Sequence, residues 1–317
     1  MIDANDEVLI FGHKDADGDT LGCSLAFAEA LKAAEKNAWV LIPPPLPQLY
    51  TWLPGFNEIV EQPPHGADPG LAFFFDSGNI ERSGEGVKHI ASHATIVNID
   101  HHTSNSRFGD LNIIDADASA VGQMVMQMLD QFGWPITPTI ATNLYVALLT
   151  DTGGFRHENT TPQALRDASR LADLGAQPGE IATMIYKMRP VTTLKLSGLA
   201  LATMRVDLGG RLAWAKVTRA MLREASAVMA ESEGIIDSLN SIAGLDVTIL
   251  FKEVKADLTK ISVRSRFNVD SAVLCAKFGG GGHPRAAGAE IAKPMDEAIK
   301  EVLAAAKEAI NAASPNF

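Results

Sequence analysis

Aspartate and histidine recur in four separated patches of the chain, and these residue types can together bind metal ions. The patches are Gly12–Asp19, Phe75–Gly78, Asp100–His102 and Thr150–Gly153. Imidazole nitrogen combined with hard carboxylate oxygen suits Mn²⁺, and to a lesser degree Mg²⁺ or Co²⁺, whereas structural zinc sites favour thiolates. Pairs of such ions assist the hydrolysis of phosphate esters. The patches therefore predict a centre for two divalent metal ions that acts on a phosphate ester.

The spacing of these residues suggests different tasks for them. Asp17 and Asp19 are two residues apart in a loop, so a turn can direct them at different ions. Asp76 stands alone at the end of a predicted strand, where it could bridge the two ions. Adjacent histidines cannot both face one point from an extended backbone. One of His101 and His102 is therefore expected to bind metal while the other reaches the substrate.

Each patch follows a short apolar, β-prone run or ends an apolar helical segment. These segments are Val8–Phe11, Leu71–Phe74, Ile96–Ile99 and Leu144–Leu149. A further strand is expected at Trp39–Ile42, and helices at about residues 20–36, 118–132, 138–149, 162–174 and 178–188. Strands that alternate with helices predict an α/β fold with a parallel sheet. Ligands just past the carboxyl ends of such strands converge at one edge of the sheet.

The helical pattern breaks at Arg189–Thr193, and the composition changes after it. Because 317 residues exceed one typical domain, we expect two domains with a cleft between them. The N-terminal domain would span residues 1–188, a linker 189–204, and a smaller C-terminal α/β domain 205–317. In the second domain, strands are predicted at residues 211–217, 246–254, 258–266 and 288–291, and helices at 269–278 and 295–312.

A run of four glycines is the most unusual feature of the predicted second domain. Glycine tolerates positive φ and lets the backbone approach a ligand, so the amides of Gly280, Gly281 and Gly282 could face a phosphate. His283 and Arg285 follow directly as hydrogen-bonding or charged partners. The Gly-Lys-Ser/Thr ending of a Walker loop is absent. The alternative interpretation of this loop is a flexible hinge.

Two arginines alternate with other residues in the predicted strand before the glycines. Arg264 and Arg266 would share one face of this strand while Val263 packs on the other. Two guanidinium groups on one face suit a phosphate or a carboxylate, and the alternative is that both are simply exposed on an edge strand. Phe155, just after the last acidic patch, is expected either in the core or as a platform for a nucleobase.

The four acidic patches, in this order, resemble the motifs of the DHH phosphoesterase family. The stretch Gly280–Gly288 resembles the Gly-Gly-Gly-His-x-x-Ala-Ala-Gly signature of its DHHA1 substrate-binding domain. The resemblance implies that one metal ion is held by His13, Asp17 and Asp76, and the other by Asp19, Asp76, His101 and Asp151. It also implies catalytic roles for the bridging Asp76, for His102 at the scissile phosphate, and for Asp100, which would orient the histidines. Asp15 is not needed by the family pattern and is expected to cap the loop.

Within this family, the chain is similar to the stand-alone nanoRNase and 3′-phosphoadenosine-5′-phosphate (pAp) phosphatase branch. The similarity implies metal-assisted in-line hydrolysis of short oligoribonucleotides, such as pApA or pGpG-like dinucleotides, to mononucleotides, and of pAp to AMP. Arg264, Arg266 and the Gly280–Arg285 stretch would bind the rest of the substrate. Two alternatives remain open: a cyclic-di-AMP phosphodiesterase, and, in another class, a dinucleotide-binding sensor without turnover. A homodimer is compatible with the resemblance.

The net charge and composition of the chain restrict the partners and the cellular location that we expect for it. A formal net charge of −11 argues against a general nucleic-acid coating protein, so a polyanionic substrate must be recruited locally by metal ions and a few cations. The chain begins without the basic start and apolar core of a secretion signal, and no apolar run approaches the roughly 20 residues of a spanning helix. Cys23 and Cys275 lie in apolar helical patterns and are expected to be free thiols. We expect a cytoplasmic protein that does not bind membranes.

Overall fold

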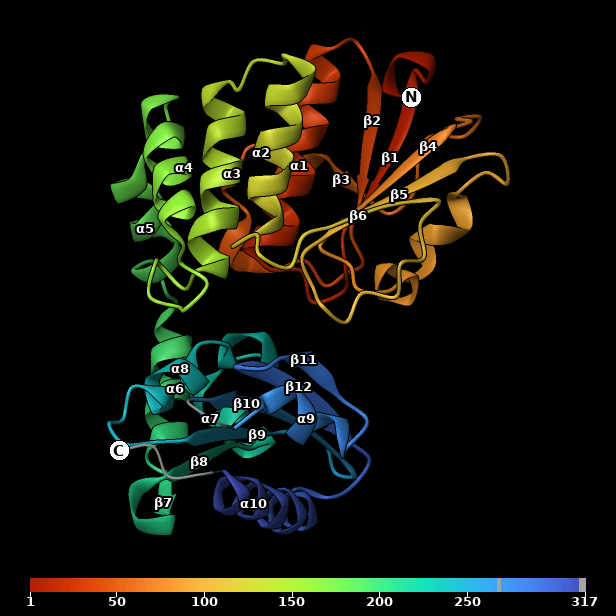
Figure 1. Ribbon diagram of the computed structural model, residues 1–317. Helices are drawn as coiled ribbons and strands as arrows, with labels where there is room; N and C mark the ends of the chain where they lie inside the picture. Colours follow the sequence, from red (N-terminus) through yellow and green to blue (C-terminus); the bar gives the residue numbers. More distant parts are fainter. Residues whose placement is uncertain (267–268, 314–317) are drawn as a thin grey trace. The chain divides into compact units, whose positions relative to one another are not determined.

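The computed structural model describes residues 1–266 and 269–313. The chain divides into two compact units, Met1–Met188 and Arg189–Phe317, each with its own sheet and core (Figure 1). Within the described residues, no helix has the length and apolar character needed to cross a membrane. Cys23 and Cys275 are buried free thiols, as predicted.

Unit 1 contains a six-stranded sheet in the order β3-β2-β1-β4-β5-β6, and all of its neighbouring strands are parallel. The strands are β1 (Glu7–Phe11), β2 (Asn37–Leu41), β3 (Ile59–Val60), β4 (Leu71–Phe75), β5 (Thr95–Asp100) and β6 (Leu111–Ile114). The predicted parallel sheet is confirmed. The edge strands β3 and β6 were not predicted, because β3 has only two residues and β6 is partly exposed and lacks a continuous apolar run.

Helices cover one face of this sheet, and a 3₁₀ segment lies on the other (Figure 1). The helices are α1 (Gly18–Ala33), α2 (Val121–Phe132), α3 (Pro138–Asp151), α4 (Pro162–Asp173) and α5 (Pro178–Tyr186). Val8 and Ile10 pack in the helix-side core, whereas Leu9 and Phe11 pack in the core under Ile80–His89. Side chains alternate across a strand, so a sheet covered on both faces needs an apolar residue at every position. The continuous apolar run of β1 meets this requirement.

Unit 2 contains a mixed six-stranded sheet in the order β11-β12-β10-β9-β8-β7, in which only β8 and β9 pair in parallel among the described strands. The strands are β7 (Arg205–Asp207), β8 (Leu212–Val217), β9 (Val247–Lys255), β10 (Leu258–Ser265), β11 (Gly281–His283) and β12 (Ala286–Ile291). The helices are α6 (Val191–Leu201), α7 (Arg219–Ala225), α8 (Ile235–Asn240), α9 (Ser271–Ala276) and α10 (Met295–Ala312). The predicted second α/β domain is therefore present.

Two cores stabilise unit 2, one on each face of its sheet. Phe251 and Val263 pack with Val302 of α10 in one core, whereas Leu250 packs with Leu196 of α6 in the other. Helix α6 lies in the segment predicted as a linker, and its buried side chains belong to the second core.

The glycine-rich stretch that was predicted to be a loop is half of a β-hairpin. In the register of β11 and β12, Gly281 pairs with Gly288 and His283 with Ala286. A Cβ atom at Gly280 would lie 2.1 Å from the carbonyl oxygen of Gly288, and one at Gly282, whose φ is +143°, would lie 2.6 Å from that of Ala286. These two glycines therefore permit close backbone approach, and the ordered hairpin contradicts the flexible-hinge alternative.

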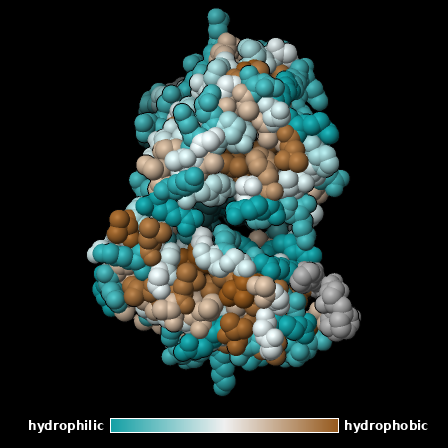
Figure 2. All heavy atoms as spheres, turned by 90° about the vertical axis from the view of Figure 1, so that its left-hand side faces the viewer, coloured by the Kyte–Doolittle hydropathy of each residue, from teal (hydrophilic) through white to brown (hydrophobic). Residues whose placement is uncertain are grey.

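Apolar side chains also reach the surface of unit 2, where Figure 2 shows brown patches among the polar side chains. The exposed members on α6, β7 and the segments beside them are Val191, Leu194, Met204, Val206 and Val228. Protein interfaces need an apolar core. A surface of this kind is compatible with the homodimer, which stays a prediction.

Candidate metal centre

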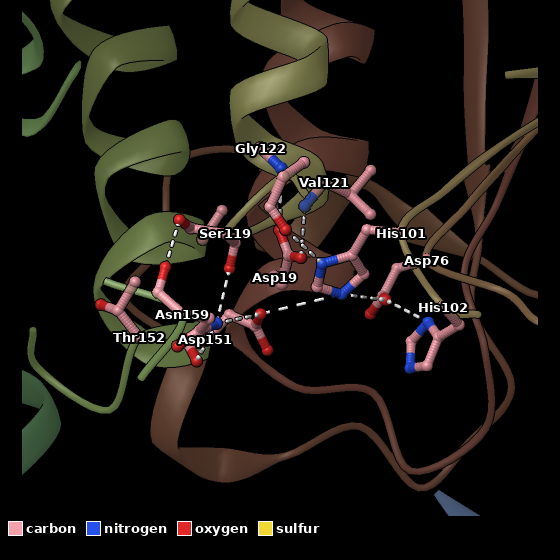
Figure 3. A network of polar contacts seen from close by, with 12 residues as sticks. Asp19, Asp76, His101, His102, Ser119, Val121, Gly122, Asp151, Thr152 and Asn159 are labelled. Carbon is pink, nitrogen blue, oxygen red and sulfur yellow. Dashed lines mark hydrogen bonds and ion pairs between the residues drawn. The ribbon is translucent and has the colours of Figure 1, made fainter. Parts of the chain in front are cut away.

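The acidic patches of unit 1 meet at the carboxyl edge of its parallel sheet. His13 follows β1, Asp76 follows β4, and Asp100 ends β5. Asp17 is the N-cap of α1, and Asp151 is the last residue of α3. All the strands run in the same direction, so residues that end or follow them gather at one edge. Figure 3 shows Asp76 and Asp151 of this edge close to His101.

Asp76 lies at the middle of the cluster and is 3% exposed. Its Oδ2 lies 3.3 Å from Nε2 of His13, and its Oδ1 lies 3.5 Å from Nδ1 of His102 and 3.8 Å from Nε2 of His101. The backbone of Asp76 is left-handed, with φ of 56°. Non-glycine residues rarely adopt this conformation, and such strain clusters at functional sites.

Among the groups of side chains whose ligand atoms lie within 4.8 Å of one another, two contain the predicted metal ligands. The members are His13, Asp17 and Asp76 in the first group, and Asp19, His101 and Asp151 in the second group. In the second group, Nε2 of His101 lies 3.7 Å from Oδ2 of Asp151. The structure thus brings together the residues that the resemblance assigns to each metal ion, with Asp76 within reach of both groups.

The charges of the centre also fit divalent cations. Burial and the neighbouring carboxylates of Asp76 and Asp151 raise the pKa of Asp19 well above its usual range. Burial, with the nearby charges of Asp17 and Asp76, raises the pKa of Asp151 to about 7. Asp19 and Asp151 therefore ionise against the negative charge of their neighbours, which two divalent ions would neutralise. The described ligand atoms are imidazole nitrogen and carboxylate oxygen without thiolate, a set that suits hard ions such as Mn²⁺.

Asp100 orients His102, which lies two residues further along the chain. Its Oδ1 accepts hydrogen bonds from the backbone amides of His101 and His102 at 2.8 and 3.2 Å, and lies 2.7 Å from Nδ1 of His102. Although burial alone would lower the pKa of His102, the Asp100 hydrogen bond and the charge of Asp76 raise it to about 9. Without metal ions, the Asp100 and Asp76 charges thus favour the imidazolium form of His102, and its ring is oriented by Asp100.

Two further residues near this centre were missed by sequence reasoning. Asn105 donates from Nδ2 to Oδ2 of Asp100 at 2.5 Å and to the carbonyl oxygen of Ser77 at 3.1 Å. Its proximity to the Asp100–His102 patch was the available signal.

The second missed residue is Arg82. Its carbonyl oxygen accepts from the amide of Lys14 at 2.7 Å, which ties it to the first acidic patch. The positive charge of Arg82 acts on His13 and His102 and lowers the pKa of each, although other charges outweigh it. Within the residues that the structure covers, its guanidinium forms no hydrogen bond or ion pair. No sequence motif marks this arginine.

The predicted substrate residues of unit 2 lie close together on its sheet. Arg264 pairs with Ala286, which pairs with His283, so the three residues form one row across β10, β12 and β11. Directly opposite residues project from the same face, and the small Ala286 separates the arginine from the histidine. Nε of Arg264 also lies 3.5 Å from Oδ1 of Asp237.

The other predicted residues of unit 2 have local hydrogen bonds. Arg266 donates from Nη1 to the carbonyl oxygen of Ile242 at 3.3 Å and from Nη2 to that of Asn240, at the end of α8. Arg285 donates to the carbonyl oxygen of Val269 at 3.2 Å. Arg266 therefore stabilises the end of a helix, and its predicted role toward substrate stays a prediction.

Asp15 and Phe155 lie at positions with positive φ, 57° and 60°. Asp15 is exposed. Phe155 is partly buried against the core, and its ring centroid lies 6.2 Å from that of Tyr145. These contacts favour a core position for Phe155 over a platform for a nucleobase.

Comparison with known proteins identifies two domains in the chain. The family model described as "DHH family, N-terminal domain" matches residues 7–148, and the one described as "DHHA1 domain" matches residues 211–312. These ranges lie in unit 1 and unit 2, respectively.

Two relatives are similar to this chain over nearly its whole length. The chain is 34% identical over 308 residues to the "Bifunctional oligoribonuclease and PAP phosphatase NrnA" of Thermus thermophilus, covering 96% of this chain and 91% of the relative. The protein with the same name from Bacillus subtilis is 27% identical over 291 residues, with 90% of each chain covered. The fold is similar to that of an exopolyphosphatase-related protein from Bacteroides fragilis, with a TM-score of 0.89, 25% identity, and coverage of 97% of this chain and 93% of that one.

Proposed function

The chain belongs to the DHH family of phosphoesterases, and on this premise we propose that it hydrolyses short oligoribonucleotides to mononucleotides, and pAp to AMP. The observation that supports the proposal most directly is the pair of ligand groups joined at Asp76. Two relatives named as bifunctional oligoribonuclease and PAP phosphatase match it over nearly the whole chain. Mn²⁺ is the proposed ion, and Mg²⁺ or Co²⁺ would also suit the ligands.

The contacts in unit 1 support a proposal for which residues would hold each ion and which would bind the phosphate. Bound divalent ions would lower the pKa of water and offset the charge that develops on the phosphate. His13, Asp17 and Asp76 would hold one ion, while Asp19, His101 and Asp151, with Asp76, would hold the other. The residues of this chain would then orient the phosphate and neutralise the part of its negative charge that the two ions do not neutralise.

His102 and Arg82 are suited to this second task. The His102 imidazolium, oriented through Nδ1 by Asp100, would donate from Nε2 to a phosphate oxygen. Arg82, whose charge acts on both His13 and His102, would contribute a guanidinium that can bind a phosphate with two parallel hydrogen bonds. Donors already in place where charge develops stabilise a transition state without reorganisation.

For unit 2, we propose that Arg264, Arg266, His283 and Arg285 bind the phosphate groups or bases away from the scissile bond. The row formed by Arg264, Ala286 and His283 supports this assignment, because it places a guanidinium and an imidazole on one sheet face. The amides of Gly280, Gly281 and Gly282 would contribute further hydrogen-bond donors.

The test is release of mononucleotides by the purified full-length protein with Mn²⁺. The substrates are pApA, a 5′-phosphorylated RNA trimer, pAp, cyclic di-AMP and pyrophosphate, compared in parallel. The control is Asp76→Asn, which removes the charge but tolerates a left-handed backbone better than other residues do.

The outcomes separate the candidate functions. Turnover of the short RNAs and pAp, lost in the Asp76→Asn variant, is the expected result. Turnover of cyclic di-AMP alone would favour the cyclic-dinucleotide phosphodiesterase. Tight binding of a dinucleotide that is recovered unchanged after hours with Mn²⁺ would identify a sensor and contradict the proposed function.

A further inference from the structure

We infer that Ser119 and Gln123 are positioning residues for the second ligand group, Asp19, His101 and Asp151. The inference rests on the proposed two-metal function and assigns a task to the segment Ala118–Gln123, which contributes no ligand itself. Three separate sets of hydrogen bonds link this one segment to all three ligands (Figure 3).

The first link is to Asp19, whose two carboxylate oxygens are both held by the start of α2. The amide of Val121 donates to Oδ2 at 2.7 Å, and the amide of Gly122 donates to Oδ1 at 2.9 Å. The first amides of a helix have no partner within the helix, and Ala120 at the N-cap makes no side-chain cap. Asp19, distant in sequence, therefore caps α2, and the position of α2 determines the orientation of this carboxylate.

The second link is to His101. Its Nδ1 lies 3.0 Å from the carbonyl oxygen of Ala118. A carbonyl oxygen can only accept, so Nδ1 carries the hydrogen and Nε2 becomes the atom available for a metal. This contact selects the tautomer of His101 and fixes its ring toward Asp76 and Asp151.

The third link reaches Asp151 through Asn159. Nδ2 of Asn159 donates to the carbonyl oxygen of Ser119 at 3.0 Å, and lies 3.2 Å and 3.4 Å from the carbonyl and Oδ2 oxygens of Asp151. In return, the hydroxyl of Ser119 donates to the carbonyl oxygen of Asn159. Ser119 thus contacts Asn159 in two places, and Asn159 holds Asp151.

Gln123 fixes the segment itself. Its Oε1 accepts from the amide of Ser119 at 2.8 Å, and its Nε2 donates to Oδ2 of Asp167, on α4, at 2.5 Å. Ser119 is 0% exposed and Gln123 is 5% exposed, so water cannot readily replace these bonds. Gln123 therefore joins α4 to the segment whose backbone and Ser119 hydroxyl contact the three ligands or their partner Asn159.

The first ligand group is held differently, which makes the inference testable. Nδ1 of His13 lies 2.6 Å from the carbonyl oxygen of Lys14, and Asp17 caps α1 by accepting from the amides of Asp19 and Thr20. These contacts of His13 and Asp17 come from residues within three positions in the sequence, Asp76 is held by Thr20, and none of these contacts involves Ala118–Gln123. Loosening the segment should therefore weaken one metal ion and spare the other.

The experiment measures Mn²⁺ binding to the metal-stripped full-length protein by calorimetry, with electron paramagnetic resonance to distinguish coupled pairs from single ions. The variants are Ser119→Ala and Gln123→Met, with Asn159→Ala at a less buried position in case the core variants do not fold. Ser24→Ala is the matched control, because the hydroxyl of Ser24 is buried in α1 without a hydrogen-bond partner among the described residues. Loss of support around metal ligands typically weakens binding by about 10–100-fold.

The expected result is that the wild type and Ser24→Ala bind two ions with a coupled signal. Each of the three test variants should retain one ion at unchanged affinity, bind the second about 10–100-fold more weakly, and show the signal of single ions. Equal weakening of both ions, as a general loss of structure would cause, would overturn the inference, as would unchanged binding of both. If the wild type binds two ions but hydrolyses none of the nucleotides, the proposed function fails while the inference stands.

Discussion

The hydroxyl of Thr20 donates a hydrogen bond of 2.6 Å to Oδ2 of Asp76, although the two residues are 56 positions apart in the sequence. Thr20 is in the first turn of α1, and Asp76 follows β4. Both side chains are buried. The same oxygen of Asp76 lies 3.3 Å from Nε2 of His13, so Thr20 holds the carboxylate that both ligand groups approach.

Replacing Thr20 by valine should weaken metal binding without a large change of shape. Valine keeps the branched side chain but removes the hydrogen bond, and Asp76 then loses a fixed orientation. We expect Mn²⁺ to bind about 10-fold more weakly, measured by calorimetry on the metal-stripped protein. Thr20→Ser, which keeps the hydroxyl, should remain near the wild type. Equal affinity in the two variants would show that the hydrogen bond is unimportant.

His102 should affect the chemical step rather than metal binding. In the His102→Gln variant, we expect kcat to fall by about 10²–10⁴-fold, the range for loss of a positioned proton donor. The variant should still bind two Mn²⁺ ions, because His102 lies outside the two groups assigned to the ions, although it forms a further group with Asp76 and Asp100. Steady-state kinetics with pApA and a titration of Mn²⁺ check both statements. Loss of an ion in this variant would instead make His102 a ligand.

Arg82 should contribute mainly to substrate binding. Removing a charge-assisted contact to phosphate costs about 1.5–3 kcal/mol, so Arg82→Ala should lower kcat/KM by at least 10-fold. Arg82→Lys should recover only part of the loss, because lysine lacks the planar fork of arginine. Arg166→Ala is the control, since Arg166 is exposed and bonds to Gln163 on α4. Matching kinetics in the Arg82 and Arg166 variants would exclude the proposed phosphate contact.

The glycines of the hairpin should differ sharply in their tolerance to substitution. Gly280→Ala and Gly282→Ala place a Cβ against neighbouring backbone, whereas a Cβ at Gly281 meets nothing within 4 Å. Overpacking costs about 1–3 kcal/mol, so each of the first two changes should lower Tm by several degrees. Gly281→Ala should stay within about 0.5 kcal/mol of the wild type. Thermal unfolding of the metal-stripped protein measures all three, and equal Tm values would contradict the hairpin packing.

Stability of the metal-free protein should fall as the pH rises from 5 to 9. The folded state raises the pKa of Asp151 to about 7 and that of His102 to about 9, and it also raises the pKa of Asp19 and His13. A raised pKa means that the folded state binds protons more tightly, so its stabilisation is present at low pH and is lost as the pH passes the folded pKa.

Acids whose pKa the folded state lowers make the protein less stable as the pH falls, and they do so in a different pH range. The folded state lowers the pKa of Asp76 and Asp100, so they reduce stability only as the pH falls below about 4. Tm of the EDTA-treated protein should therefore be lower at pH 8 than at pH 5, and Asp151→Asn should flatten this dependence. Mn²⁺ should raise Tm more at pH 8 than at pH 5. A Tm that is constant across this range would contradict the predicted charge balance.

Local patterns in the sequence were sufficient to predict the central strands β1, β2, β4 and β5 and the helices of unit 1, but not its edge strands. The apolar run of β1 packs on both faces of the sheet, and its predicted end places His13 at the carboxyl edge. The ligand groups containing Asp17, Asp19 and Asp151 could be anticipated because Asp17 and Asp19 lie at the start of α1 and Asp151 ends α3, both recognisable elements. Hydrophobic periodicity determines these elements locally, and parallel strands bring their ends together.

Only the tertiary structure revealed how those ligands are supported. Asp19 caps α2 across more than 100 residues, and Asn159 joins Ser119 to Asp151. Arg82 lies in no motif. The strand β11 in the glycine-rich stretch could not be predicted, because its pairing with β12 cannot be read from composition. Such contacts depend on which distant segments the crossovers bring side by side. The sequence by itself therefore determined the fold class and the candidate ligand residues, while long-range packing decided the orientation of these residues and the balance of buried charge.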